Sequence, residues 1–236
     1  MITRVLLLSP HPDDIAWSLG GTLARLTGAG VEVWTLTFFT RSRYAPGHRT
    51  QDVEHVSAVR AAEEHSWAGA TGVVLLRGEL ADSGLRGYDD LTELGAQPEP
   101  DVVLDASALL RGVVDRHGMD AVLAPGSRGG HVDHTAVRLA AAGLPAELPV
   151  LHYDDLPYAV TLAPPAGGQR VLVDVADLWD AKEAGMRHFP SQCWQDTLPV
   201  VRAYAASVGG EQLWTDNPAG AALLSRLTAR AVEVAL

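Results

Sequence analysis

Cysteine is almost absent from the 236-residue chain, with Cys193 as its single example. A lone cysteine excludes an intramolecular disulfide and any zinc site built from several thiolates. Long apolar runs are missing as well. The stretch Val5 to Leu8 is far too short for a signal-sequence core or a membrane span, and no later stretch reaches that length. We therefore expect a cytoplasmic protein without a membrane span.

Positive charge is also scarce, since 18 Lys and Arg stand against 29 Asp and Glu, for a net charge of −11. A surface of this sign does not neutralise phosphates, so we expect no nucleic-acid partner. The first apolar segment is not followed by a G-x-G-x-x-G fingerprint, which disfavours a dinucleotide site. Neither composition nor charge indicates an oligomeric state.

The hydrophobic share of 47% and the charged share of 20% are typical of a globular protein. The length suits one large α/β domain with a full core. No Pro, Gly or Ser tract is long enough for a linker, and no sharp change of composition marks a boundary. We predict a single domain over 1–236, with a Rossmann-like layer over 1–156 and a smaller C-terminal extension over 157–236 packed on it.

Short apolar runs alternate with helical patterns along most of the chain. The apolar runs predict strands at 5–9, 31–39, 73–76, 121–125 and 149–153. The patterns between them predict helices at 18–29, 53–72, 102–115 and 134–143. An edge strand at 171–175 and helices at 178–187 and 198–207 are predicted to finish the chain. This alternation implies a mostly parallel sheet covered by helices on both faces.

Two polar segments follow strands of this predicted sheet. "SPHPDD" follows the strand at 5–9, and "GSRGGHVDH" follows the strand at 121–125. In open α/β sheets, ligands bind beyond the carboxyl ends of the strands, at the point where the strand order reverses. If these two strands are neighbours, the segments form one site, composed of His11, Asp13, Asp14, His131, Asp133 and His134.

Imidazoles and carboxylates in this number favour a metal ion. Asp13 and Asp14 repel each other when both are ionised, and a cation beside them relieves that repulsion. Two imidazoles and one carboxylate leave an open position for water, as in a catalytic zinc site, and also suit iron or another divalent ion. Each segment alone is more typical of a capped helix start. Their predicted adjacency favours the metal.

Several segments, taken in order, resemble the PIG-L/LmbE family of zinc-dependent de-N-acetylases, which act on N-acetylglucosaminyl and related substrates. They are "SPHPDDIAWSLGGTLARL", "RAAEEHSWAGATGV", "LADSGLR" and "GGHVDHTAV". Two further segments resemble parts of bacterial members, "LHYDDLPYA" and "WDAKEAGMRHFPSQ". The resemblance implies a zinc ion and a small amino-sugar or glycoside substrate.

The resemblance also implies roles for individual residues. It makes His11, Asp14 and His134 the metal ligands. It makes Asp13 the general base, which removes a proton from the metal-activated water. The same carboxyl group then returns the proton to the departing nitrogen, so one residue serves as base and as acid.

Four more residues receive roles from the resemblance. His131 is expected to stabilise the oxyanion, and Asp133 is expected to orient His131 and keep it cationic. Arg60 and Asp82 match positions that contact the sugar in members of the family. These two residues are therefore predicted to bind substrate.

The chain departs from the family pattern at a few positions. Ile15 stands where a Glu is common, which is expected to alter the hydrogen bonds around the metal ligands. Val132 replaces a frequent proline and supplies no functional side chain. Gly129 and Gly130 leave no bulky polar side chain immediately before His131 to assist the oxyanion, a role that is open to another loop.

Two loops are expected near the site. The segment 40–49 carries Arg41, Arg43 and Arg49 in an otherwise acidic chain, and one hypothesis is that these side chains contact an anionic group of the substrate. The alternative is a solvated loop. The segment 78–100 is predicted to lie over the site as a lid.

Two other functions remain compatible with the residues. A metal-dependent phosphoesterase also uses clustered Asp and His, although it favours two metal ions and more ligands. A carbohydrate-binding relative without turnover would keep the pocket, and Ile15 leaves that alternative open.

Overall fold

The computed structural model describes residues 3–49, 51–89, 92–162 and 168–234. Its strands are β1 (Arg4–Ser9), β2 (Glu32–Arg41), β3 (Val74–Ala81), β4 (Ala121–Pro125), β5 (Val150–Tyr153), β6 (Gln169–Val173) and β7 (Glu211–Thr215). Its helices are α1 (Asp14–Gly28), α2 (Val53–Thr71), α3 (Pro100–His117), α4 (Val132–Ala142), α5 (Trp179–Met186), α6 (Trp194–Val208) and α7 (Pro218–Val234). Within the described ranges, no helix combines the length and the apolar character needed to cross a membrane.

All the strands belong to one sheet, in the order β3-β2-β1-β4-β5-β7-β6. The strands from β3 to β5 run parallel, whereas β7 pairs antiparallel with both β5 and β6. Strands β1 and β4 are direct neighbours, with Leu6 opposite Val122 and Leu7 opposite Leu123. The predicted Rossmann-like arrangement is therefore confirmed, and so is the adjacency on which the site depends.

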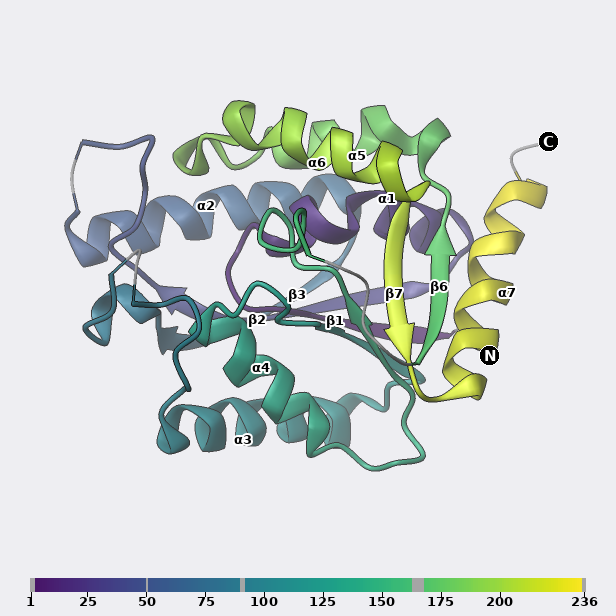
Figure 1. Cartoon of the computed structure of the whole chain (residues 1–236), viewed down its shortest axis with the longest axis horizontal. Coiled ribbons are helices and arrows are strands. Elements are labelled where there is room, and N and C mark those ends of the chain that lie inside the picture. The colour runs from purple at the N-terminus through teal and green to yellow at the C-terminus, as the bar shows by residue number, and fades with distance from the viewer. Residues whose placement is uncertain (1–2, 50, 90–91, 163–167, 235–236) are drawn as a thin grey trace.

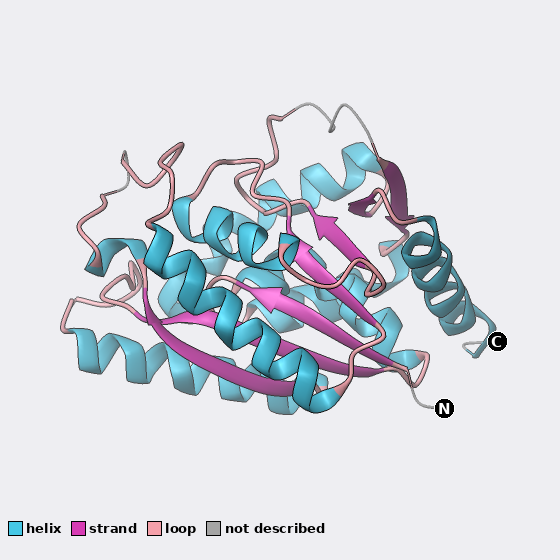
Figure 2. Cartoon of the chain, turned by 90° about the horizontal axis from the view of Figure 1, so that it is seen from below, coloured by secondary structure: helices cyan, strands magenta, loops and turns pink. Residues whose placement is uncertain are grey.

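Helices cover both faces of the sheet (Figure 1), as the apolar strands predict. Along β1, Leu6 and Leu8 pack on the side of α3 and α4, whereas Val5 and Leu7 pack on the side of α1 and α2. Figure 2, in which the molecule is seen from below, shows helices lying in front of the strands. Neither face of the central strands is left to solvent, because Leu6, Leu7 and Leu8 are fully buried.

The C-terminal part of the chain differs from its prediction. The helices expected over 178–187 and 198–207 exist as α5 and α6, but they do not finish the chain. Strand β7 and helix α7 follow, and β7 inserts between β5 and β6. The segment expected as an extension thus contributes two strands to the central sheet.

Helix α1 contains a kink that a distant carboxylate stabilises. Leu19 leaves helical geometry, at φ −128° and ψ 16°. The backbone N–H groups of Gly21 and Thr22, just beyond the kink, donate to the carboxylate of Glu211 over 3.0 and 2.7 Å. The Lys182 ammonium balances this charge at 2.6 Å, and both ionic side chains are buried. One ion pair therefore joins α5 and β7 to the helix that begins in the site.

We predict that Lys182→Met destabilises the protein by roughly 3–5 kcal/mol, because it leaves Glu211 as an uncompensated buried charge. Equilibrium unfolding in urea measures this cost. The control is Glu183→Gln, which removes the partner of the exposed Arg187 side chain in the same helix and is expected to cost about 1 kcal/mol or less. Equal losses in the two variants would show that burial of the Lys182 pair is not the cause.

Candidate active site

The polar segments that follow β1 and β4 meet at one edge of the sheet. His11 and Asp14 lie on the turn from β1 into α1, and His131 precedes α4. The rings of His11, His131 and His134 lie within 5.4 Å of one another, measured between centroids. Asp133 joins them, with a carboxylate oxygen 2.9 Å from Nε2 of His11. The structure thus brings together residues that are far apart in the sequence.

Three donor atoms in this cluster converge as metal ligands do: Nδ1 of His11, Oδ2 of Asp14 and Nε2 of His134. The first lies 3.3 Å, and the last 3.4 Å, from the Asp14 oxygen. Nε2 of His134 is buried and has no hydrogen-bond partner among the described residues. An orphaned buried nitrogen is costly, and a metal ion is a suitable partner for it. The donor set therefore fits a divalent ion.

Carboxylates stand behind both candidate imidazole ligands. Oδ2 of Asp133 is 2.9 Å from Nε2 of His11, and Oδ1 of Asp155 is 2.7 Å from Nδ1 of His134. Each carboxylate holds the ring nitrogen that faces away from the candidate ion. This arrangement fixes the tautomer of a histidine ligand and raises its basicity.

The Asp133 carboxylate makes most of its contacts away from His131. Its Oδ1 accepts from Arg86 over 2.8 Å, and its Oδ2 also accepts the backbone N–H of Ser83 over 3.0 Å. The carboxylate that faces His131 is instead Glu93, at 3.4 Å from Nε2. Burial lowers the pKa of His131, although Glu93 acts in the opposite direction. The Asp133 carboxylate thus contacts His11, Arg86 and Ser83, while its backbone N–H donates to Nδ1 of His131, and the role of Asp133 toward His131 stays a prediction.

The carboxylates around His11 and His134 favour positive charge on these two imidazoles. Burial opposes a charge on His11, but Asp133 and Asp14 outweigh it and raise the pKa of His11 to about 10. Burial likewise opposes a charge on His134, and Asp14 with Asp155 raises its pKa nonetheless. The same carboxylates would stabilise a divalent cation bound between the neutral imidazoles, which supports the metal site.

Asp13 lies beside the candidate ligands and forms an ion pair with the buried Arg60. Nη2 of Arg60 is 3.0 Å from Oδ1 of Asp13, and Nη1 donates to Ser42 Oγ over 3.1 Å. Burial raises the pKa of Asp13, whereas Arg60 acts to lower it. A carboxylate with these opposed influences is suited to taking up a proton and releasing it.

A cavity of about 380 Å³ opens onto these residues. Its wall includes residues from the site, from the segments 82–89 and 93–94, from the loop after β5 and from the first turn of α6. Asp13, Arg60, Asp82 and His131 all line it. Asp82 is 4% exposed, and its Oδ1 accepts the backbone N–H of Leu85 over 3.1 Å. Arg60 and Asp82 are thus placed where a substrate would lie, and their contact with it remains a prediction.

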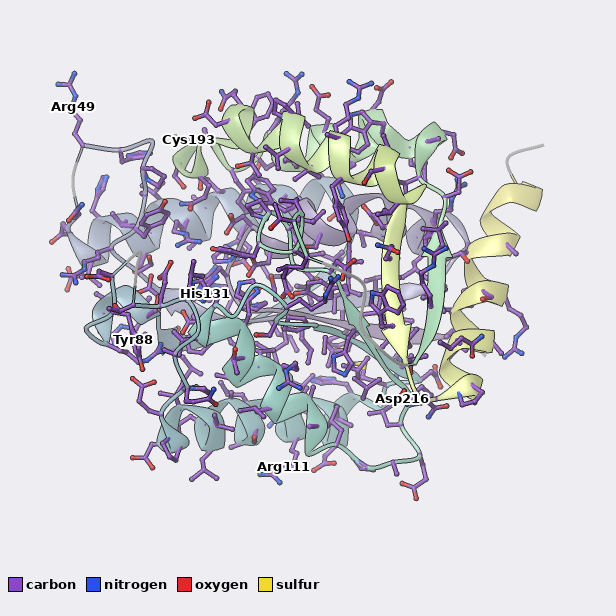
Figure 3. All side chains as sticks on the ribbon, viewed as in Figure 1. Arg49, Tyr88, Arg111, His131, Cys193 and Asp216 are labelled. Atoms are coloured by element: carbon purple, nitrogen blue, oxygen red, sulfur yellow. The ribbon has the colours of Figure 1, made fainter. Side chains whose placement is uncertain are left out.

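The arginines of the 40–49 segment do not line the cavity. Only Tyr44 of this segment is part of the wall among the described residues. The side chain of Arg43 donates to the carbonyl oxygen of Gly84 over 2.5 Å, and Arg41 and Arg49 are exposed. Arg49 projects outward from the loop, away from His131 (Figure 3). The hypothesis that these arginines hold an anionic group of the substrate gains no support from their positions.

Comparison with known proteins identifies the family. Residues 6–144 match the family model described as "PIG-L: GlcNAc-PI de-N-acetylase". A curated relative, the 2'-N-acetylparomamine deacetylase of Streptomyces fradiae, is 38% identical over 92% of this chain and 83% of the relative. The chain belongs to the PIG-L family of de-N-acetylases. The sequence resemblance is thereby confirmed.

Solved structures show the same PIG-L fold. The zinc-inhibited form of the teicoplanin deacetylase Orf2 superposes with a TM-score of 0.71 at 25% identity, and covers 90% of this chain and 97% of its own. A triple mutant of a deacetylase in the teicoplanin biosynthetic pathway superposes with a TM-score of 0.75 at 23% identity, with coverages of 90% and 97%. This PIG-L protein is an enzyme of the deacetylase class, a hydrolase of N-acyl groups.

Several site residues of this PIG-L protein escaped the sequence analysis. Asp155 lies just after β5, a strand predicted next to β4, so the strand-end argument could have found it. Arg86 and Glu93 lie on the predicted lid, where no spacing reveals which side chain turns inward. Ile15, whose departure from the family pattern raised doubt, is fully buried in the apolar core.

We predict that Asp155→Asn weakens divalent-metal binding by roughly 10- to 100-fold, because it removes the negative charge that holds and polarises His134. Competition with a chromogenic chelator measures the dissociation constant without any substrate. Asp177→Asn is the matched control, since its carboxylate is 62% exposed and pairs with Arg25. An unchanged affinity in Asp155→Asn would show that the 2.7 Å contact does not support a ligand.

Proposed function

We propose that this PIG-L protein is a zinc-dependent deacetylase that hydrolyses the N-acetyl group of an amino sugar within a small glycoside. His11, Asp14 and His134 hold the ion, and Asp13 serves as base and then as acid. His131 assists the acyl oxygen. Arg60 and Asp82 contact the sugar.

The buried Nε2 of His134 carries this proposal. It has no hydrogen-bond partner in the described ranges, and it converges with Nδ1 of His11 and Oδ2 of Asp14. A second group, of His11, His131 and Asp133, also has donor atoms close together. It is the weaker candidate because both Asp133 oxygens accept hydrogen bonds and the cation Arg86 already neutralises this carboxylate, whereas Asp14 accepts only the backbone N–H of His11 among the described contacts and has no Arg or Lys beside it. One well-formed site suits a deacetylase better than a phosphoesterase with two ions.

The chemistry follows from the positions of the side chains. A bound zinc ion supplies a more acidic water and a polarised acyl oxygen. Asp13, which lines the cavity beside the ligands, removes the proton from the attacking water and later donates it to the nitrogen. His131 accepts a backbone N–H at Nδ1, so its neutral ring carries a proton at Nε2 that it donates to the developing oxyanion.

We expect about one zinc ion per wild-type chain and release of acetate from N-acetylated amino sugars, including 2'-N-acetylparomamine. His134→Ala should lose both the metal and the activity. Asp13→Asn should retain the metal while kcat falls on the order of 10²- to 10⁴-fold, because the base is missing. Elemental analysis and acetate release on the same samples measure these outcomes.

The control for this experiment is Arg49→Ala, which changes an exposed side chain outside the cavity and should leave both readings unchanged. Two ions per chain with phosphate-ester hydrolysis would favour the phosphoesterase. Sugar binding by metal-replete protein without acetate release would favour a carbohydrate-binding relative.

The charge of the cavity bears on the kind of glycoside. Among the described residues of the wall, Arg60 is the sole Arg or Lys, and it pairs with Asp13. Asp82, Asp89 and Glu93 line the part of the wall formed by the 82–94 segment. This negatively charged wall favours a substrate with ammonium groups over one with a phosphate or a carboxylate. We propose an N-acetylated aminoglycoside as the substrate class, the chemistry that the name of the Streptomyces fradiae relative also describes.

We predict that kcat/KM is at least about tenfold higher for an N-acetylated aminoglycoside than for N-acetylglucosamine 1-phosphate at low ionic strength. The ratio should shrink as salt is added, because screening weakens the attraction between substrate and cavity. Initial rates at two salt concentrations test this. Equal specificity constants, or a preference for the phosphate, would contradict the proposed substrate class.

A further inference from the structure

Tyr158 lies in the active-site cavity and has no role in the chemistry described above. It follows β5 and forms part of the cavity wall. Its ring centroid is 5.4 Å from that of His131 and 5.3 Å from that of His134, edge-on to the latter. The side chain thus lies against both the candidate oxyanion donor and a candidate metal ligand.

The hydroxyl of the half-buried Tyr158 differs from those of the buried Tyr153 and Tyr204. The Tyr153 hydroxyl donates to the carbonyl oxygen of Leu8 over 2.9 Å, and the Tyr204 hydroxyl donates to Asp154. The Tyr158 hydroxyl makes no hydrogen bond to any described residue, and Tyr158 borders the cavity. Because Tyr158 is only half-buried and borders the cavity, its hydroxyl can donate to a molecule that occupies the cavity.

Gly129 explains how Tyr158 reaches this place. A Cβ atom at position 129 would lie 2.2 Å from Cβ of Tyr158, closer than two carbon atoms can approach. Glycine is therefore required for the tyrosine to pack here. Residue 129 is also the position, two before His131, that offers no polar side chain to the oxyanion. Tyr158 occupies the space that such a side chain would fill.

The backbone on both sides of Tyr158 is anchored. The N–H of Leu156 donates to Ser18 Oγ over 3.0 Å, and the N–H of Ala159 donates to the carbonyl oxygen of Asp155 over 2.7 Å. The first contact reaches α1, and the second joins the segment to the residue that supports His134. Tyr158 is thus held in place before substrate arrives, as effective transition-state stabilisation requires.

We propose that Tyr158 is a further catalytic residue, whose hydroxyl donates a hydrogen bond to the acyl oxygen of the amide as negative charge develops there. This inference rests on the proposed deacetylase function. The water oxygen bonds to the acyl carbon, and the carbonyl electron pair moves onto the acyl oxygen. The water proton passes through Asp13 to the nitrogen as the carbon–nitrogen bond breaks.

Tyr158 keeps its own proton throughout this reaction. A tyrosine hydroxyl ordinarily titrates near pH 10, far above neutrality. The hydroxyl is therefore a donor at neutral pH, and it complements the N–H of His131 on the same oxygen.

Tyr158→Phe tests the proposal, because it removes the hydroxyl and keeps the ring. We expect kcat to fall at least about tenfold, since one donor to an oxyanion is lost, while KM, zinc content and thermal midpoint stay close to wild type. Tyr153→Phe is the matched control. It removes a hydroxyl that bonds to Leu8 outside the cavity, so stability falls slightly and kcat does not.

Gly129→Ala supplies a second, independent test. The added methyl group should displace Tyr158 and reproduce much of the loss in kcat, and combining it with Tyr158→Phe should cost less than the product of the two separate losses. A Tyr158→Phe variant with kcat within twofold of wild type, or with a changed KM alone, would overturn the inference and leave the deacetylase function intact. A wild-type enzyme that releases no acetate would overturn both.

Discussion

The accumulation of buried negative charge at the carboxyl ends of β1 and β4 is the constraint on which the site depends. Asp13, Asp14 and Asp133 lie almost out of reach of solvent, where ionised carboxylates need nearby cations. Arg60 pairs with Asp13, and Arg86 pairs with Asp133. Asp14 faces only imidazoles among its charged contacts. It is therefore the carboxylate left for a metal ion.

The sequence alone was sufficient to locate this cluster, because two rules of parallel sheets act together. Apolar runs marked β1 and β4, and the reversal of strand order places their carboxyl ends side by side. Which carboxylate faces which imidazole could not be read from spacing. Asp133 turns toward His11 because Arg86 and Ser83 approach it from the segment after β3, a loop whose path no periodicity determines.

The missed strand β7 has a similar explanation. Its five residues carry too little pattern to distinguish it from a loop, and its position between β5 and β6 depends on antiparallel pairing across a long stretch of chain. Tyr158 could not be identified from the sequence either, because its contact with Gly129 joins two turns whose paths no periodicity determines. The sequence showed only that position 129 lacked a side chain, and the structure shows what occupies the space.

The contact between Glu211 and the kink of α1 also bears on how the molecule assembles during synthesis. The helix that carries Asp14 emerges from the ribosome before β7 does, but the carboxylate that satisfies its freed N–H groups belongs to β7. Until that strand has emerged, the kinked helix keeps unsatisfied donors beside an open sheet edge. The kink that follows the site turn therefore reaches its final hydrogen bonds only after a strand that lies much later in the chain has been translated.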